Sequence, residues 1–450
     1  MSRLTDQFLE KYTAVLDRSR IGTELYNKYN VKRGLRNSNG TGVLVGLTEI
    51  GNVHGYVHED EEKRPVEGRL SYRGIEIKDL VHGCQRDGRF GFEETAFLLL
   101  FGYLPNREEL AFFNQILGEL RRLPPNFTED SILKSPSKNI MNKLARSVLV
   151  SYSYDQNPDD ISIENNLRQC VELMARFPTM VAYGYQAKRH YYDGESLFLH
   201  SPVEDLSTSE NFLLMTRLDK QYTQLEAEIL DLILMIHAEH GGGNNSAFTT
   251  HVVSSSGTDI YAAISAAVGS LKGPLHGGAN VMVYKMMEDI KRNVKDWGDR
   301  KEVASYIEKI LRKEAFDGKG LVYGMGHAVY TLSDPRAVLL KEKAGEVAKA
   351  SGREKEFGLL CLIEELTPEL FYKVKNNDKP LCANVDFYSG FVYTALNIDP
   401  ELFTPLFAVS RISGWCAHRM EEIVSGGRIM RPAYKNVSRV CGYAEMDERA

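Results

Sequence analysis

The sequence predicts a mainly α-helical fold in which short strands are confined to the N-terminal part of the chain. Apolar residues recur at helical spacing in one segment after another from Phe92 onward. Segments with the alternating, β-branched pattern of strands occur only between residues 43 and 77. No fixed sequence period recurs, which argues against a solenoid array. With 450 residues, 43% of them hydrophobic, the chain is long enough for two or three domains and a large core.

The first predicted element is a helix over Leu4–Tyr29. Its apolar positions fall on one face: Leu4, Phe8, Tyr12 and Leu16. A Gly- and Asn-rich break follows at Gly34–Gly42. After this break, the patterns predict three short strands, over Val43–Ile50, Tyr56–His58 and Leu70–Ile77.

The remaining elements are predicted helices. Phe92–Phe101 and Arg107–Arg122 are separated by Gly102–Asn106, a stop signal followed by a new cap. Further helices are predicted over Asn139–Tyr154, Ile163–Arg189, Glu210–Thr216, Leu225–His240, Asp259–Leu271, Asn280–Lys295, Val303–Glu314, Asp334–Ala350, Glu354–Lys375 and Asp399–Ile423.

Composition narrows the class of protein. A net charge of −6 argues against a nucleic-acid binder with a broad basic surface, although a few arginines in a cleft could still bind anionic substrates. Six cysteines without a CxxC pair predict reduced thiols. The N-terminus lacks the pattern of a signal or transit peptide, and no apolar run is long enough to span a membrane. We therefore expect a cytoplasmic protein with no membrane partner.

Three glycine-flanked histidine segments are candidates for a functional site: His237–Asn244, Gly273–Asn280 and Gly324–Tyr330. Glycine beside histidine lets backbone and substrate approach closely. Each histidine could equally be an ordinary helix-end residue. His237 and His240 could also form a metal pair, but the HExxH order is absent and no third ligand is evident.

A fourth segment, Ala383–Gly390, places Asp386 in an apolar and aromatic run. A carboxylate is costly in such surroundings unless it has a partner or a task. Taken alone, Asp386 could simply cap a helix.

Together these segments resemble the citrate synthase family. The motifs are GPLHGGAN at 273–280, GMGHAVY at 324–330 with DPR at 334–336, and NVDFYSG at 384–390. The likeness continues through FLLLFGYLPNREEL at 97–110 and VSR at 409–411. It implies a homodimeric, almost entirely helical enzyme. Its large domain would comprise residues 1–277 and 398–450, and a small domain of residues 278–397 would close over the substrates.

By this resemblance, His276, His327 and Asp386 form the catalytic trio. Asp386 would remove a proton from the methyl group of acetyl-CoA. His276, at a Gly-rich helix start, would stabilise the enol or enolate oxygen as a neutral imidazole. His327 would polarise the ketone of oxaloacetate and protonate the alkoxide. Citryl-CoA would then be hydrolysed, with no permanently bound cofactor and no metal.

The residues implied to hold oxaloacetate and citrate are His240, Arg336, Arg411 and Arg431. Arginine suits this task because its planar fork pairs with carboxylates. Arg431, in the C-terminal Arg-Pro, would reach into the site of the partner subunit.

The loop Lys319–Gly326 resembles the family's CoA-binding loop. The contacts implied are with Lys319, Val322, Gly324 and Gly326. The family often has an aromatic residue where Met325 stands and a basic residue where Thr331 stands, so one phosphate contact is in doubt.

Three alternatives remain open on the sequence. One is 2-methylcitrate synthesis from propionyl-CoA, because a pocket discriminates one methylene by only about 1–3 kcal/mol. Another is a metal-dependent hydrolase using His237, His240 and His276. The third is a helical scaffold without catalytic activity.

Overall fold

The computed structural model describes residues 10, 11, 13, 21–37, 40–59, 62–376 and 379–448. The chain divides into two compact units, residues 1–47 and residues 48–450. Each is described separately below.

The first unit contains helix α2 (Thr23–Lys28) and the 3-10 helix η1 (Arg33–Leu35). Leu4, Phe8, Tyr12 and Leu16, which define the face of the predicted first helix, lie outside the described residues.

The strand predicted over Val43–Ile50 is wrong. Residues 43–50 form neither helix nor strand, and the first strand begins at Gly51. Leu44 and Leu47 are 84% and 90% exposed. The segment around these two leucines therefore does not pack one side against the core. Strand propensity depends on such packing.

The second unit begins with a three-stranded antiparallel sheet of order β1-β2-β3. β1 (Gly51–Glu59) pairs with β2 (Glu62–Tyr72), which pairs with β3 (Ile75–Glu76). The prediction over residues 56–58 is confirmed within β1. The segment predicted as one strand over 70–77 instead folds back, because Arg73 and Gly74 both have positive φ (48° and 83°) and form a two-residue hairpin turn.

The mainly α-helical fold class is confirmed. α4 (Phe92–Phe101) and α15 (Glu354–Lys375) have the predicted bounds, and the other helices predicted from Arg107 onward differ from the observed ones by a few residues at their ends. Those others are α5 (Arg107–Leu120), α6 (Ile140–Ser151), α7 (Ile163–Asp193), α8 (Thr208–Thr216), α9 (Gln224–His237), α11 (Ile260–Lys272), α12 (Ala279–Asn293), α13 (Arg300–Leu311), α14 (Pro335–Ala350) and α17 (Phe403–Val424). The single helix predicted over Leu4–Tyr29 is wrong, because residues 21–22 are not helical and α2 begins at Thr23.

Three helices were not predicted: α3 (Ile77–Arg86), α10 (Asn245–Ser254) and α16 (Val385–Ala395). All three are short, and α10 and α16 contain many β-branched, hydroxyl or aromatic residues of low helix propensity. Tertiary packing stabilises them, since α10 packs on α11 and α17 while α16 packs on α12 and α14. The short elements η2 (Thr128–Leu133), η3 (Tyr152–Tyr154), η4 (Pro400–Leu402) and η5 (Met446–Glu448) complete the described structure.

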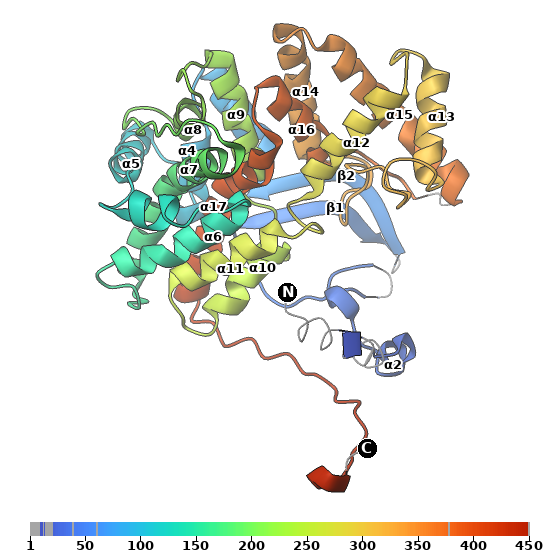
Figure 1. Ribbon diagram of the computed structural model, residues 1–450, viewed down its shortest axis with the longest axis horizontal. Helices are drawn as coiled ribbons and strands as arrows, with labels where there is room; N and C mark the ends of the chain where they lie inside the picture. Colours follow the sequence, from blue (N-terminus) through green and yellow to red (C-terminus); the bar gives the residue numbers. More distant parts are fainter. Residues whose placement is uncertain are drawn as a thin grey trace. The chain divides into compact units, whose positions relative to one another are not determined.

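Helix α17 lies in the middle of the helical core, where α4, α7, α9, α10 and α11 pack around it (Figure 1). Every residue from Phe403 to Met420 is buried. A helix buried on all sides has no solvent face for polar groups. Its buried Arg411 and His418 therefore need partners within the protein or from a ligand.

A second set of helices packs largely on itself: α12 on α16, α16 on α14, α14 on α15 and α15 on α13 (Figure 1). These helices follow one another between residues 279 and 395. Contacts of α12 with α17 and of α14 with α9 connect this set to the core.

None of the helices described here combines the length and the apolar character that crossing a bilayer would require.

Candidate active site

The predicted site residues of this chain lie at helix ends and on the buried helix α17. His240 follows α9, and His276 precedes α12. His327 lies in the loop between α13 and α14, while Asp386 is in the first turn of α16. Helix ends place backbone donors and side chains at defined positions, because the first and last turns lack internal hydrogen-bond partners.

The tautomer of His327 follows from its contacts. Its Nδ1 accepts hydrogen bonds from the backbone N–H groups of Val329 and Tyr330, both at 3.1 Å. Because an accepting ring nitrogen carries no proton, the neutral ring holds its proton on Nε2. The ring also stacks on Tyr330 with centroids 4.7 Å apart. His327 is thus an oriented hydrogen-bond donor through Nε2.

His240 lies beside His327, with ring centroids 5.1 Å apart in an edge-on arrangement. Burial lowers the pKa of His240 well below its usual value, and the nearby Arg336 lowers it further. Its Nε2 is buried without a hydrogen-bond partner in the described chain. A neutral imidazole is therefore available to a ligand at this point.

Hydrogen bonds join the segment before Asp386, residues 382–384, to residues 324–326 of the loop that carries His327; we call this set of hydrogen bonds the lock. Asn384 caps α16 by accepting from the backbone N–H of Asp386 at 3.0 Å, and its Nδ2 donates to the carbonyl of Gly326 at 2.8 Å. Two backbone hydrogen bonds join the same segments: Gly326 N–H to Cys382 at 2.7 Å and Asn384 N–H to Gly324 at 2.8 Å. The loop that carries His327 and the helix start that carries Asp386 therefore move as one piece.

The surroundings of the Asp386 carboxyl group raise its pKa and favour a role as a base. Burial raises its pKa from 3.8 to about 6, although Arg336 and Arg411 oppose the rise. One carboxyl oxygen, Oδ1, is buried without a hydrogen-bond partner in the described chain. Asp386 is thus ionised at neutral pH and poorly solvated, which increases its basicity.

The two buried arginines differ in their pairing. Arg336 forms a bidentate pair with Asp334, the cap of α14, at 3.0 and 2.8 Å. Arg411 donates Nε–H to the carbonyl of His237 at 2.6 Å and lies over the ring of Phe407, 4.7 Å from its centroid, but its two terminal nitrogens have no hydrogen-bond partner in the described chain. Burial lowers the pKa of Arg411 to about 10. An unpaired buried guanidinium costs several kcal/mol, so this arrangement indicates a site for an anion.

His276 is supported by residues that the sequence did not reveal. Its Nε2 lies 3.1 Å from Oγ of Ser246, a buried residue of α10. Ser246 also receives the indole N–H of Trp415 at 3.0 Å. Burial and the charge of Arg411 lower the pKa of His276 to about 4, so the ring is neutral at pH 7. One signal was available: Trp415 is one of two tryptophans, and a buried indole N–H needs an acceptor.

Two predicted site residues, Arg431 and Lys319, form no contact with the histidines, Asp386 or the buried arginines that any described hydrogen bond or ion pair records. Arg431 is exposed in the segment after α17, where the described chain gives it no hydrogen bond or ion pair with the other predicted residues. Lys319 is 65% exposed and lies 3.9 Å from Asp317.

Gly324 and Gly326 have structural roles of their own. Their φ values are +83° and +94°, which favour glycine. A Cβ on Gly324 would lie 2.9 Å from the Cα of Phe387. Val322, in the same loop, belongs to the hydrophobic core.

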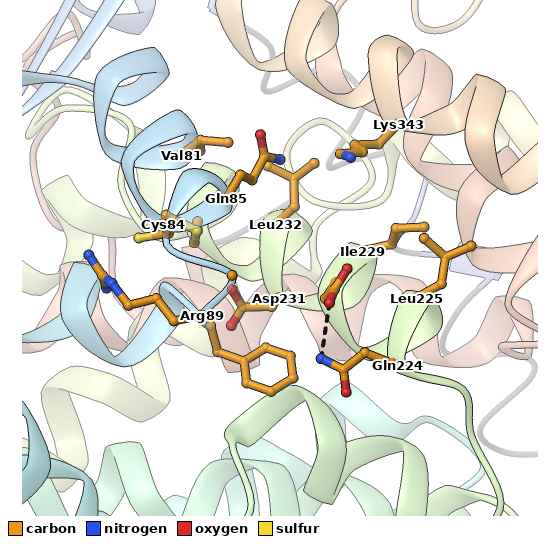
Figure 2. Close-up of a pocket in the computed structure, with 14 residues that line it drawn as sticks. Val81, Cys84, Gln85, Arg89, Gln224, Leu225, Ile229, Asp231, Leu232 and Lys343 are labelled. Carbon is orange, nitrogen blue, oxygen red and sulfur yellow. Dashed lines mark hydrogen bonds between the residues drawn. The ribbon is translucent and has the colours of Figure 1, made fainter.

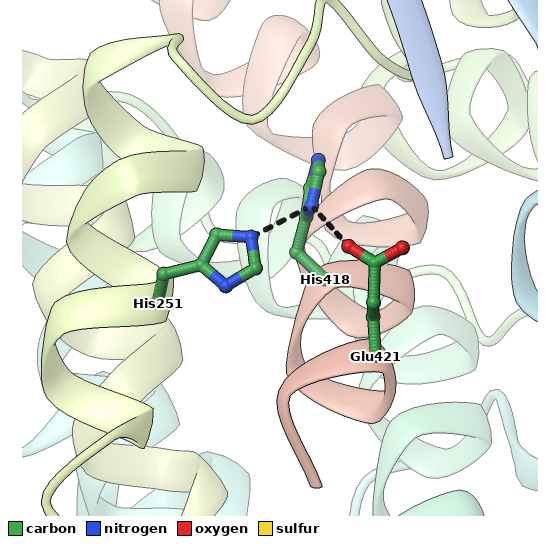
Figure 3. A group of neighbouring side chains, drawn as sticks. All are labelled: His251, His418 and Glu421. Carbon is green, nitrogen blue, oxygen red and sulfur yellow. Dashed lines mark hydrogen bonds and ion pairs between the residues drawn. The ribbon is translucent and has the colours of Figure 1, made fainter. Parts of the chain in front are cut away.

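The histidines of the hydrolase alternative do not form a metal-binding group. His237 holds the carbonyl of Ile233 at 2.9 Å through Nδ1, as part of its own helix. Among the described residues, the one group of three donors within 4.8 Å of one another is His251, His418 and Glu421 (Figure 3). The facing nitrogens of the two histidines are 3.0 Å apart, whereas ligands of a tetrahedral zinc ion are spaced by about 3.3 Å. We assign this contact to a hydrogen bond.

A cavity of about 130 Å³ opens between α3 and α9 (Figure 2). Its lining includes Cys84, Arg89, Glu228, Asp231 and Lys343, and none of the predicted site residues. Asp231 accepts the backbone N–H groups of Gly91 and Phe92 at 2.7 and 3.2 Å, so it caps α4. We therefore treat this cavity as separate from the candidate site.

The chain is similar to known citrate synthases over most of its length. The family model described as citrate synthase, C-terminal domain, matches residues 38–433. Citrate synthase 2 of Bacillus subtilis is 35% identical over 370 residues, covering 82% of this chain and 90% of its own length. The 2-methylcitrate synthase of Shewanella oneidensis is 31% identical over 364 residues, covering 81% and 87%.

A crystal structure of citrate synthase from Pyrobaculum aerophilum superimposes with a TM-score of 0.73 at 30% identity. It covers 90% of this chain and 94% of its own. The family-model match includes the sheet, the helical core and all four segments of the candidate site. The chain therefore belongs to the citrate synthase family, enzymes that transfer an acyl group in a condensation reaction.

Proposed function

We propose that this protein condenses acetyl-CoA with oxaloacetate and hydrolyses the resulting citryl-CoA to citrate and CoA. The observation that carries the proposal is the pair of buried, unpaired terminal nitrogens of Arg411. A dicarboxylate such as oxaloacetate supplies the missing charge, because a carboxylate accepts both N–H groups of a guanidinium fork. Arg336 and His240 contribute further positive potential and a hydrogen bond at the same place.

Asp386 is the base in the first step. Its carboxylate removes a proton from the methyl group next to the thioester, and its poor solvation makes the removal easier. The same site needs a donor for the thioester oxygen, since negative charge collects there as the proton leaves.

His276 is that donor. Its Nε2 faces Ser246, so Nδ1 is the nitrogen left for the thioester oxygen. Nδ1 carries the proton when Ser246, which accepts the indole N–H of Trp415, donates its hydroxyl proton to Nε2 rather than to Oδ1 of Asn244 at 2.9 Å. A neutral imidazole donates this hydrogen bond without becoming a strong acid.

His327 acts on the second substrate. Its Nε2–H donates to the ketone oxygen of oxaloacetate, and the methylene carbon of the enol attacks the ketone carbon. The new C–C bond leaves an alkoxide, which takes the proton from His327. Water then attacks the thioester carbon, and the C–S bond breaks to give citrate and the CoA thiol. One proton of the water goes to the thiolate; of the other water proton and the proton held by Asp386, one restores His327 and one leaves to solvent.

Several finer expectations belong to the same proposal. Acetyl-CoA is a substrate rather than a resident cofactor, and the loop with Lys319, Val322, Gly324 and Gly326 contacts it. A small domain of residues 278–397 closes over the substrates, supported by the mutual packing of the helices within it. The enzyme is a cytoplasmic homodimer in which Arg431 completes the site of the other subunit.

The test is release of free CoA thiol from acetyl-CoA, with and without oxaloacetate, and from propionyl-CoA in parallel. Oxaloacetate-dependent release that is faster with acetyl-CoA is the expected result. Faster release from propionyl-CoA would replace the proposal with 2-methylcitrate synthesis. No release from either substrate would refute both condensations and would favour the alternative of a helical scaffold without catalytic activity.

Arg411→Met is the informative variant. Because methionine removes a buried unpaired charge, we expect oxaloacetate-dependent release to fall by about 100-fold or more while the melting temperature stays the same or rises. Arg300→Met serves as the control, since Arg300 lies on the surface in a pair with Glu365. Full activity in Arg411→Met would contradict the assignment.

A further inference from the structure

Helix α17 carries charged groups along one face, from the candidate site toward the surface. Arg411, Gly414 and His418 follow at spacings of three and four residues, which keeps them on the same side of a helix. Glu421 and Glu422 continue that face toward the end of the helix. His251 of α10 lies opposite His418 (Figure 3).

The carboxylate of Glu239 is built into this face. Glu239 immediately precedes His240 and has no exposed surface. Two glycines make room for it: a Cβ on Gly414 would lie 2.4 Å from its Oε2, and a Cβ on Gly51 would lie 2.8 Å from its Cγ. A buried carboxylate needs a cation, because desolvation of a lone charge is costly.

Two cations compete for Glu239. His418 Nε2 lies 3.1 Å from its Oε1. Arg411, one helical turn before Gly414, is attracted to the same carboxylate. Among the described residues, His418 is the cation within ion-pair distance of Glu239, although the angle of this contact is not that of a hydrogen bond. The terminal nitrogens of Arg411 form no hydrogen bond with Glu239.

Short contacts with carboxylates indicate the protonation of the two histidines. His251 Nδ1 is hydrogen-bonded to Glu422 at 2.8 Å, and His418 Nε2 lies within ion-pair distance of Glu239, so protons on both outer nitrogens are favoured. The inner nitrogens, His251 Nε2 and His418 Nδ1, are 3.0 Å apart. Two lone pairs would repel at this distance, so one shared proton lies between them. The pair therefore holds three protons and one positive charge.

We infer that His418 is a positioning residue: as the charged member of this pair, it binds Glu239 and thereby leaves Arg411 free for the substrate carboxylate. The inference rests on the proposed role of Arg411 in binding oxaloacetate. Without the cation, Glu239 would turn to the guanidinium of Arg411 and compete with the substrate.

The pKa values agree with this geometry. Burial lowers the pKa of His418, but Glu239 and, to a lesser extent, Glu421 outweigh burial and raise it to about 9. Burial raises the pKa of Glu239, yet His418 and then Arg411 bring it below its usual value. Besides those on its own helix, the charged and titratable groups facing His418 are Glu239 from the segment after α9 and His251 from α10. From α17 itself comes Glu421, and Glu422 of the same helix reaches the pair through His251.

The test compares His418→Asn, Glu239→Gln and the double variant by calorimetric titration with oxaloacetate and by thiol release. His418→Asn leaves Glu239 without its cation, so we expect oxaloacetate affinity to fall about tenfold or more. Glu239→Gln removes the competitor, and the double variant has a neutral, hydrogen-bonding pair. In both, affinity should stay within about threefold of wild type.

His251→Gln is the matched control. It is buried in the same cluster but does not touch Glu239, so it should keep oxaloacetate affinity within about threefold. Equal losses in His251→Gln and His418→Asn would overturn the inference, because they would indicate general damage to the cluster. A loss in Glu239→Gln as large as in His418→Asn would also overturn it. Should His418→Asn not fold, Glu239→Gln and the double variant still decide.

A pH titration gives an independent readout. His418 loses its proton near pH 9, so wild-type oxaloacetate affinity should fall as the pH rises through that value. The double variant should bind equally well across this range. Persistence of the fall in the double variant would assign it to Arg411 and overturn the inference. One equivalent of bound metal per chain would do the same, since a metal ion would then replace the shared proton.

These measurements distinguish a failure of the proposed function from a failure of the role inferred for His418. Wild-type thiol release alone decides the proposed function. The pattern among the variants decides the role of His418.

Discussion

At the scale of single residues, the candidate site depends on groups held in an unfavourable state without their ligand. Arg411 has no partner for its terminal nitrogens, and Asp386 keeps one buried oxygen without a donor. The rise in the pKa of Asp386 from 3.8 to about 6 corresponds to roughly 3 kcal/mol. Such costs are typical of sites whose chemistry needs poorly solvated charges.

If Asp386 is the catalytic base, kcat should decrease on the acidic side of its pH profile. Because its folded pKa lies above the unfolded value, Asp386 binds a proton as pH falls through about 6, and kcat should fall with it. Asp386→Asn should lower kcat by about 100-fold or more and remove this decrease. The same variant should be as stable as wild type or more stable at pH 7. A decrease that persists in the residual activity would assign it to another group.

Ser246 is the hydrogen-bond partner of His276 Nε2, and its removal is expected to affect kcat rather than substrate binding. Ser246→Ala takes away one hydrogen bond, so kcat should fall by about fivefold or more while the KM for oxaloacetate changes little. Ser265→Ala is the control, since Ser265 bonds the carbonyl of Ala145 away from the site. A rise in the KM for oxaloacetate with unchanged kcat would contradict the role assigned to Ser246.

At the scale of elements, the site is assembled by loops that are locked to helix starts. The segments 324–326 and 382–384 are joined by backbone and side-chain hydrogen bonds. This lock fixes His327 relative to Asp386, and it requires glycine at 324. The loop Lys319–Gly326 is predicted from the resemblance to contact CoA, and the structure adds a role in chain packing for Gly324 and Gly326.

Gly324→Ala tests the lock. A Cβ there would lie 2.9 Å from the backbone of Phe387, on a residue with φ of +83°. We expect the free energy of unfolding to fall by about 2–4 kcal/mol and kcat to fall as well. Gly318→Ala is the control, because its φ is +68° but its nearest contact is at 3.9 Å. It should lose only the roughly 1–2 kcal/mol of backbone strain. Equal losses of stability in both variants would argue against the lock.

At the scale of the whole molecule, the described chain leaves Arg431 apart from the other predicted residues. The resemblance explains this if Arg431 serves the partner subunit. The domain closure proposed for residues 278–397 belongs to the same scale, since it brings together groups from different helices.

Mixing two inactive variants tests the shared site. One subunit carries Asp386→Asn and the other Arg431→Leu. In a mixed dimer, one site keeps both native residues if Arg431 acts in the partner. Random mixing should therefore restore about a quarter of wild-type activity. If Arg431 acted within its own subunit, both sites would stay defective and no activity would return.

The sequence by itself determined the helical class, most helix positions, the family and the identities of the catalytic candidates. These depend on local periodicity and on short motifs, which contiguous residues encode. It misjudged residues 43–50 and did not reveal α3, α10 or α16, because packing rather than propensity stabilises such segments.

Only the tertiary structure decided which side chains support the site. Ser246 and Trp415 are 169 positions apart, and Glu239 meets His418 across a similar separation. Their partners, the unpaired state of Arg411 and the tautomer of His327 follow from distances between elements. No local pattern specifies those distances, since they are set by how the whole core packs.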